Sequence, residues 1–266
     1  MPMAPVPSLG SFPFGRPVIP VLQADRAPKR VFVLGVYASA VHAQWRGPDE
    51  RVRVRALAVA SEPSIFWRGE DVARIVAEIE VPARFGRLEP AAPQFNGPSG
   101  VALDDCFLEP LGLARADAWL CDLVPYSCVN PAQGAALARE YLPLVADGLP
   151  APTVGPVPSV LATAERRAEI LTEIEASGAD VVVLLGDQPL RWFLRELDGE
   201  RRARLAAFGA TPSSYGRLHR VRIGTRDRLV LPVAHPRQVA RLGSHSKEWF
   251  ALHDTWRRDV APSLLG

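Results

Sequence analysis

The chain has 266 residues, of which 48% are apolar and 23% charged, and its formal net charge is +2. These values are typical of a folded globular protein and exclude a disordered chain. No apolar run reaches the roughly 18 residues that a membrane-spanning helix needs, so no membrane partner is expected. Scattered prolines replace the apolar core of a secretory signal, and three cysteines are too few for a disulfide framework. We therefore expect a cytoplasmic protein.

Lysine occurs only at Lys29 and Lys247, so 29 of the 31 basic residues are arginine. GC-rich codon usage is the simpler explanation, and arginines that bind phosphates are the functional one. A near-neutral total does not exclude nucleic-acid binding, because one concentrated basic face is sufficient.

Residues 1–28 contain seven prolines and no periodic apolar pattern, which predicts an extended Pro-rich arm on the surface. Beyond it, two kinds of pattern alternate. Continuous apolar runs, typical of strands buried on both faces, occupy residues 30–37, 54–60, 119–124, 180–186 and 229–234. Helical patterns occupy residues 70–80, 99–111, 131–146, 159–176, 188–197 and 246–260, with Ser159 as the expected N-cap of the fourth.

This alternation predicts one α/β domain over residues 29–266, a three-layer sandwich with a central, mostly parallel sheet flanked by helices. Residues 218–223 are expected to form a local hairpin with the last strand. Ligands bind such sheets beyond the carboxyl ends of the strands, so the residues after each strand are the candidates for a site. Neither a G-x-G-x-x-G fingerprint nor a P-loop is present, so no nucleotide cofactor is expected.

The residues at the strand ends each have an ordinary structural explanation, but their order along the chain is informative. The ordered set is Leu34-Gly35-Val36-Tyr37-Ala38, Glu62-Pro63-Ser64, Leu120-Cys121-Asp122, Val183-Leu184-Leu185-Gly186 and His235-Pro236-Arg237-Gln238-Val239. This set resembles the motifs of the uracil-DNA glycosylase superfamily and extends from Lys29 to Asp259. An unrelated α/β hydrolase is disfavoured, because the G-x-S-x-G elbow is missing.

The resemblance implies a monofunctional DNA glycosylase of base excision repair, which flips a damaged base out of DNA and hydrolyses its N-glycosidic bond. It assigns His235 the role of donating a hydrogen bond to an oxygen of the leaving base. It also implies that Gly35, Val36 and Tyr37 hold the carbonyl edge of the base and that Asp122 reads another edge. DNA is the expected partner of a nucleoid-associated monomer, and no cofactor is implied.

One departure from the family concerns the water. Several branches have Asp or Asn two residues after the first glycine to position it, and this chain has Tyr37 there. The sequence does not choose among Glu62, Asp104 and Asp49 as replacements, and we take Glu62 as the catalytic carboxylate. Tyr37 could instead stack on a base or block the pocket. In that alternative the protein binds DNA or damaged bases without turnover.

A second departure concerns base recognition, because Asp122 stands where relatives use Asn to read N3–H and O4 of uracil. An ionised carboxylate only accepts hydrogen bonds, so it suits an amino-bearing or modified base better. A protonated Asp122 in an apolar pocket would donate to O4 and restore uracil-like recognition. Asn130 from the next loop is a third possibility.

The segment after the His-Pro dipeptide would form the loop that enters DNA. Val239 or Leu242 would fill the space of the flipped base, and Arg237, Arg241 and Ser64 would contact phosphates. A plain start of a helix that packs Val239 and Leu242 into the core explains the same residues.

No metal is expected. Three cysteines without a CxxC pair do not supply the iron–sulfur cluster that some branches of the family carry, and the histidine spacing is unlike that of a zinc site.

Overall fold

The computed structural model describes residues 9–197, 200–240 and 246–265. The chain divides into two compact units, each assembled from separate segments. Unit 1 consists of Met1–Val21, Tyr37–Pro98 and Pro125–Ser159, and unit 2 of Leu22–Val36, Ser99–Val124 and Val160–Gly266. The single domain expected over residues 29–266 stays a prediction.

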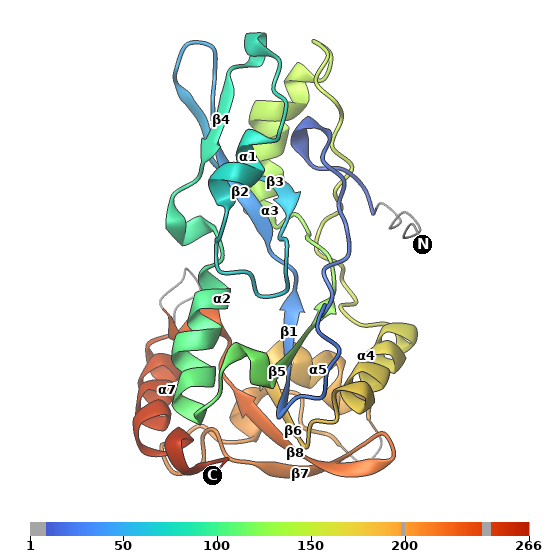
Figure 1. Ribbon diagram of the computed structural model, residues 1–266, viewed down its shortest axis with the longest axis vertical. Coiled ribbons are helices and arrows are strands. Elements are labelled where there is room, and N and C mark those ends of the chain that lie inside the picture. The colour runs from blue at the N-terminus through green and yellow to red at the C-terminus, as the bar shows by residue number, and fades with distance from the viewer. Residues whose placement is uncertain (1–8, 198–199, 241–245, 266) are drawn as a thin grey trace. The chain divides into compact units, whose positions relative to one another are not determined.

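Unit 2 contains a five-stranded sheet with the strand order β5-β1-β6-β8-β7 (Figure 1). β1 and β8 both run parallel to β6, and β7 pairs antiparallel with β8. The mostly parallel sheet and the hairpin at its end, both expected from the sequence, are therefore confirmed. The strands are β1 (Val31–Tyr37), β5 (Ala118–Val124), β6 (Val181–Leu185), β7 (His219–Ile223) and β8 (Arg226–Val233).

Helices cover both sides of this sheet, and in Figure 1 α2 and α7 lie on one side and α4 on the other. Every residue of β5 and β6 is buried, because neither face of these strands meets water. No helix in the described parts of the chain is both long and apolar enough to cross a membrane. The helices are α2 (Pro98–Leu103), α4 (Ala164–Ser177), α5 (Asp187–Trp192), α6 (Pro236–Val239) and α7 (Lys247–Asp259).

The boundaries of α4 follow from its two ends. The Thr163 hydroxyl accepts the backbone N–H of Arg166, and Gly178 ends the helix with a φ of 67°. The expected N-cap, Ser159, lies outside the helix. That prediction is wrong because Thr163 is the residue whose side chain reaches the unpaired N–H groups of the first turn.

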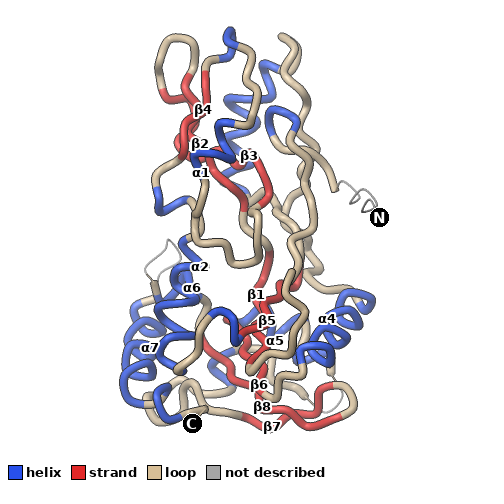
Figure 2. Tube along the Cα trace, in the orientation of Figure 1, coloured by secondary structure: helices blue, strands red, loops and turns tan. Residues whose placement is uncertain are grey.

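Unit 1 contains a three-stranded antiparallel sheet in the order β3-β2-β4 (Figure 2). Helix α1 packs on β4, and α3 packs on β3. The expectation that residues 54–60 join the main parallel sheet is wrong. These residues form a hairpin with β2 instead, closed by a hydrogen bond from the N–H of Gly47 to the carbonyl of Arg51. The elements are β2 (Ala40–Arg46), β3 (Val52–Ser61), β4 (Arg87–Pro90), α1 (Val72–Ala77) and α3 (Pro131–Ala136).

The described N-terminal segment packs into unit 1. Phe12 and Val18 are buried in an apolar cluster of this unit. The Tyr141 hydroxyl accepts the N–H of Phe14 over 2.7 Å and donates to the carbonyl of Pro150 over 3.1 Å. An arm lying only on the surface is therefore not what this segment forms, because its apolar side chains complete the core of the unit.

Candidate active site

The carboxyl edge of the parallel sheet in unit 2 gathers residues from neighbouring strands. Because β1, β6 and β8 run in the same direction, Val36, Gly186 and His235 all lie at this edge, where the three strands end. Gly35 is buried one residue earlier on β1, and Asp122 lies near the end of β5, the neighbour of β1. The topology thus gathers predicted site residues that are far apart in the sequence.

The ends of β6 and β8 come close together at Gly186. Its N–H donates to the carbonyl of Val233 over 2.8 Å, and its φ of 84° is one that side-chain-bearing residues rarely adopt. A Cβ on Gly186 would lie 3.0 Å from the Cβ of His235. Glycine at this position therefore lets His235 sit directly against the end of β6. Its signal in the sequence is a glycine between a buried strand and a helix.

His235 is the N-cap of α6, and its own ring caps the helix. Nδ1 accepts the backbone N–H of Arg237 over 3.2 Å, and the N–H of His235 donates to Oε1 of Gln238 over 3.1 Å. Burial, assisted by the charge of Arg237, lowers the pKa of His235 from 6.5 to about 4. The ring is therefore neutral at pH 7, and a neutral ring that accepts at Nδ1 carries its proton on Nε2.

Asp122 is a buried acid on β5, 3% exposed, and the N–H of Val36 donates to its carboxyl group. Burial raises the pKa of Asp122 from 3.8 to about 7, against the opposing effects of the Arg166 charge and the Val36 hydrogen bond. Both forms of the carboxyl group are therefore populated at neutral pH. The Val36 amide, which was expected to hold the base, is bonded to Asp122 in this structure.

Arg166 of α4 supports the end of β5, a role that the sequence analysis missed. Its Nη2 donates to the carbonyl of Asp122 over 2.8 Å, and its Nε donates to the carbonyl of Leu123 over 3.2 Å. Its Nη1 lies 2.8 Å from Glu169 and 3.4 Å from Glu173. No local pattern distinguishes this arginine from the others on the helix, because its partners are main-chain carbonyls of a distant strand.

Within unit 1, Glu62 is attached to the loop that follows β1. Glu62 directly follows β3, is 2% exposed, and its Oε1 accepts the N–H of Ser39 over 3.0 Å. The Ser127 hydroxyl donates to the carbonyl of the same Ser39. Tyr37, the last residue of β1, precedes this loop. Unit 1 therefore holds the buried Glu62 carboxylate against Ser39, two residues after Tyr37.

A model of one family, the uracil DNA glycosylase superfamily, matches residues 90–255, more than half of the chain. The chain belongs to the uracil-DNA glycosylase superfamily. The matched stretch includes Asp122 and His235. It begins after β1 and Glu62, so the equivalence of the first two motifs stays a prediction. No curated protein matches the chain.

The other candidate residues for the superfamily's water and base contacts are engaged elsewhere. Asp49 lies exposed in the β2–β3 turn, and Asp104 forms an ion pair with Arg115 at 2.9 Å. The side chain of Asn130 caps α3 by accepting the N–H of Gln133 over 3.0 Å. Of the three carboxylates considered, Glu62 is the one bonded to the loop after β1.

The residues expected to bind DNA fall into three groups. Ser64 is exposed in unit 1, and Arg237 is exposed at the start of α6 in unit 2. Val239 is 3% exposed, as a packed start of a helix would have it. Arg241 and Leu242 lie outside the described residues. The burial of Val239 therefore disfavours it as the side chain that fills the space of a flipped base.

The described residues offer few groups that could bind a metal ion or form a lysine Schiff base. Within residues 9–197, 200–240 and 246–265, no three His, Cys, Asp or Glu side chains are grouped to hold a metal ion. Cys106, Cys121 and Cys128 are free thiols. The ammonium group of Lys29 is paired with Asp25.

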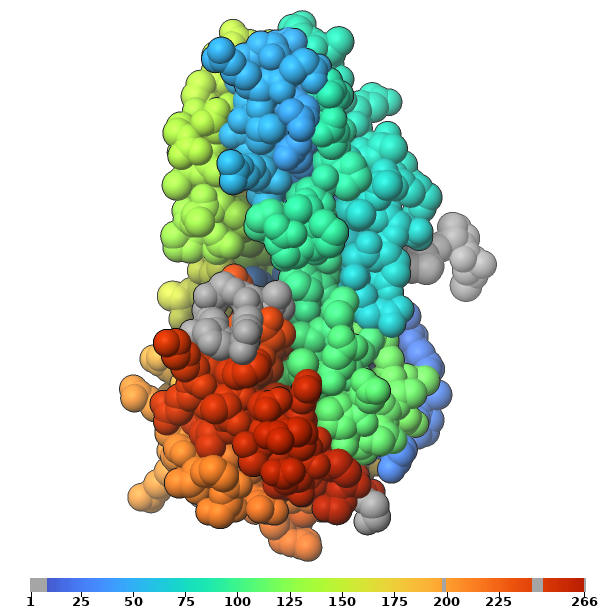
Figure 3. All heavy atoms as spheres, turned by 90° about the vertical axis from the view of Figure 1, so that its left-hand side faces the viewer, coloured from blue at the N-terminus to red at the C-terminus, as the bar shows by residue number. Residues whose placement is uncertain are grey.

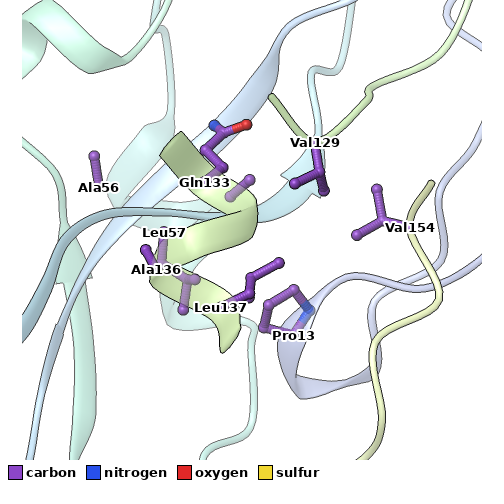
Figure 4. Close-up of a pocket in the computed structure, with 9 residues that line it drawn as sticks. Pro13, Ala56, Leu57, Val129, Gln133, Ala136, Leu137 and Val154 are labelled. Atoms are coloured by element: carbon purple, nitrogen blue, oxygen red, sulfur yellow. The ribbon is translucent and has the colours of Figure 1, made fainter. Parts of the chain in front are cut away.

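A small pocket lies within unit 1 (Figure 4). Gln133 is the polar side chain of an otherwise apolar lining, and none of the predicted site residues contributes to it. An apolar pocket whose one polar side chain is an amide contains no acid or base for hydrolysis of a glycosidic bond, so we do not assign the active site to it. Its lining consists of Pro13, Ala56, Leu57, Ala58, Val129, Gln133, Ala136, Leu137 and Val154.

Proposed function

We propose that the protein is a monofunctional DNA glycosylase that hydrolyses the N-glycosidic bond of a flipped, uracil-like base. The observation that carries the proposal is the protonation state and position of the His235 ring. In a member of this superfamily, a neutral ring with its proton on Nε2 lies at the carboxyl edge of the parallel sheet. DNA is the proposed partner of a cytoplasmic monomer.

The chemistry requires stabilisation of the departing base. When the bond between the sugar and the base breaks, its electron pair goes to the base, and negative charge develops on a base oxygen. The Nε2–H of His235 donates a hydrogen bond to that oxygen. Because the ring is already neutral and held by the α6 cap, it needs no reorientation as the charge develops, which is the condition for strong electrostatic stabilisation.

Water is the proposed acceptor of the sugar, with Glu62 taking its proton. The support is the bond between Glu62 and Ser39 in the loop after β1. Cleavage through a lysine Schiff base has little support, because the chain has only Lys29, which is ion-paired, and Lys247 at the start of α7. Hydrolysis without strand cleavage is therefore the proposed outcome.

The base edge is read by Asp122 in its protonated form. One carboxyl oxygen accepts the Val36 N–H, and a proton on the carboxyl group would donate to a base carbonyl such as O4 of uracil. A pKa of about 7 supports this form at and below neutral pH. An ionised Asp122 would favour an exocyclic amine instead, so the pH dependence of the reaction separates the two substrate classes.

The test is base release from single- and double-stranded oligonucleotides that carry uracil, 5-substituted uracils, hypoxanthine or cytosine analogues. We expect release of a carbonyl-bearing base and an abasic site that alkali cleaves. His235→Asn keeps a side chain that can cap α6 but removes the imidazole donor, and we expect a rate loss of about 100- to 1,000-fold. DNA binding without release would support the inactive alternative, and failure to bind DNA at low salt would contradict both readings.

The assignment of Glu62 is checked in the same assay. Glu62→Gln keeps the size of the side chain and the acceptor for the Ser39 N–H, but it removes the carboxylate that would take the proton of water. We expect a rate loss of about 100-fold or more. Asp49→Asn, at an exposed turn, is the matched control and should leave the rate unchanged. The reverse pattern would move the role away from Glu62.

A further inference from the structure

A chain of buried hydrogen bonds runs through unit 2 to the residue just after β8. The N–H of Ala234 donates to the Tyr215 hydroxyl over 2.8 Å, and that hydroxyl lies 2.8 Å from Nδ1 of His253. Nε2 of His253 lies 2.9 Å from the carbonyl oxygen of Cys106. The turn before β7, helix α7 and the π-helical turn after α2 are thereby joined to the end of β8.

Each proton in this chain has one possible position. The N–H of Ala234 can only donate, and the carbonyl of Cys106 can only accept. The Tyr215 oxygen therefore accepts the first bond, and His253 carries its proton on Nε2. Nδ1 of the neutral ring is then an acceptor, so the Tyr215 O–H donates to it. Burial lowers the pKa of His253 from 6.5 to about 4, which keeps the ring neutral at pH 7.

Close packing holds the chain in place. Tyr215 is 1% exposed and His253 is 2% exposed. The His253 ring lies 4.5 Å from the ring of Phe107 and 4.9 Å from that of Trp256, measured between centroids. Helix α7, drawn in red in Figure 3, lies at the surface of unit 2 and buries His253 on its inner side. Polar groups fixed in such an interior have few alternative arrangements.

The chain of hydrogen bonds matters because it ends at Ala234, the residue before His235. Ala234 follows the last residue of β8, so its N–H falls beyond the strand ladder and needs another partner. Tyr215 supplies that partner immediately before His235. On the other side, the His235 ring is bonded to the N–H of Arg237 in α6. The backbone is thus anchored before His235 and its ring is anchored after it.

We propose that Tyr215 and His253 are positioning residues that aim the Nε2–H of His235. The inference rests on the proposed glycosylase function, in which that proton stabilises the leaving base. Neither residue touches the base; they act through the peptide of Ala234. Displacement of a reacting group by about 1 Å can lower a rate about 100-fold. We therefore expect the rate of base release to depend on this anchor.

Tyr215→Phe tests the anchor, because it keeps the ring and removes only the hydroxyl. We expect the single-turnover rate of base release to fall about 10- to 100-fold, with an unchanged Kd for the same oligonucleotide. In a His235→Asn background we expect no further loss, because residues that act through one group are not additive. His253→Gln retains an acceptor and a donor, and it should keep much of the activity that His253→Leu loses.

Tyr141→Phe is the matched control. The Tyr141 hydroxyl is also buried and also bridges a backbone N–H and a backbone carbonyl, those of Phe14 and Pro150 in unit 1. We expect this variant to lose stability without a change in rate. Equal rate losses in the two variants, or an additive loss in the His235→Asn background, would show a merely structural role and overturn the proposal.

Two NMR measurements separate this inference from the proposed function. In Tyr215→Phe we expect faster amide hydrogen exchange at Ala234 and a shifted resonance of the His235 Nε2 proton. If no oligonucleotide releases a base, the function fails, while these two changes still support the anchor. Unchanged exchange and an unchanged resonance would contradict the anchor even in an active enzyme.

Discussion

Asp122 is a carboxyl group that burial has moved into the physiological range. Its pKa of about 7 divides it between a form that donates a hydrogen bond and a form that only accepts. A relative with Asn at this position has a donor and an acceptor at every pH. Under the proposed function, recognition of the base by Asp122 therefore depends on pH.

The pH profile of base release reports which form of Asp122 acts. For a uracil-like base we expect the substrate-binding step to weaken as the pH rises through about 7, because the donating proton is lost. Asp122→Asn should remove this step from the profile of kcat/KM and keep activity at pH 8. A profile that rises through pH 7, or one that Asp122→Asn leaves unchanged, would exclude the protonated form as the reader of the base.

The same substitution should change stability in a way that does not depend on turnover. The pKa of Asp122 is higher in the folded chain than in the unfolded chain, so between pH 4 and 7 the unfolded chain releases its proton first. The free energy of unfolding therefore falls as the pH rises from 4 to 7, by an amount on the order of 4 kcal/mol at most. Urea unfolding at pH 5 and pH 8 should show that Asp122→Asn is relatively more stable at the higher pH.

Residues at strand ends could be predicted from the sequence, and their supports could not. His235 and Asp122 stand out because a polar residue at or near the end of an apolar run is a local signal. Tyr215 and His253 carry no such signal, since their partners are a backbone N–H and a carbonyl in distant segments. Local patterns show only a residue's neighbours in the sequence, whereas Tyr215 and His253 contact segments that are distant in the sequence.

At the scale of elements, the parallel sheet was predictable, whereas the hairpin of β2 and β3 was not recognised. Its signal was present: Val41, Ala43 and Trp45 alternate with polar residues, as in a strand with one buried face. Residues 54–60 were assigned to the parallel sheet because a continuous apolar run is the same in either kind of sheet. Strand pairing is decided by the turn between β2 and β3, not by the run itself.

The contact between α4 and β5 is the element-level feature that holds Asp122. The side chain of Arg166 is 12% exposed, and it neutralises Glu173, which is equally buried. We expect Arg166→Met to leave that carboxylate uncompensated and to lower the free energy of unfolding by about 3–5 kcal/mol. Because the charge of Arg166 opposes protonation of Asp122, the same variant should raise the pH at which base release declines.

Arg258→Met is the control for this prediction. Arg258 lies on α7, its side chain is 60% exposed, and its ion pair with Asp254 is within the same helix. Exposed pairs of this kind contribute about 1 kcal/mol or less. A similar loss of stability in both variants, measured by urea unfolding, would show that the burial of Arg166 does not increase its contribution to stability.

At the scale of the whole molecule, the units are interleaved along the chain. Each is built from three segments, and the chain passes from one unit to the other in the middle of its sequence as well as near its beginning. Bringing the segments of one unit together therefore closes loops of chain that belong to the other unit. We therefore expect the two units to unfold together, as one domain.

The three cysteines can test this expectation, because Cys128 lies in unit 1 and Cys106 and Cys121 lie in unit 2. Burial raises the pKa of all three thiols, so they should react slowly in the folded chain. With brief alkylation at increasing urea and mass spectrometry of the peptides, we expect one shared midpoint. A separate midpoint for Cys128 would show that the units are independent domains.

The interleaving also governs how the protein behaves when its backbone is broken. A single cut anywhere between residues 37 and 159 would leave both fragments with part of each unit. Such fragments should remain associated under native conditions and elute as one species, and they should come apart only in denaturant. For the same reason, neither unit can be expressed as one uninterrupted stretch of the gene, and reconstruction of the sheet alone would require rejoining its segments with new loops.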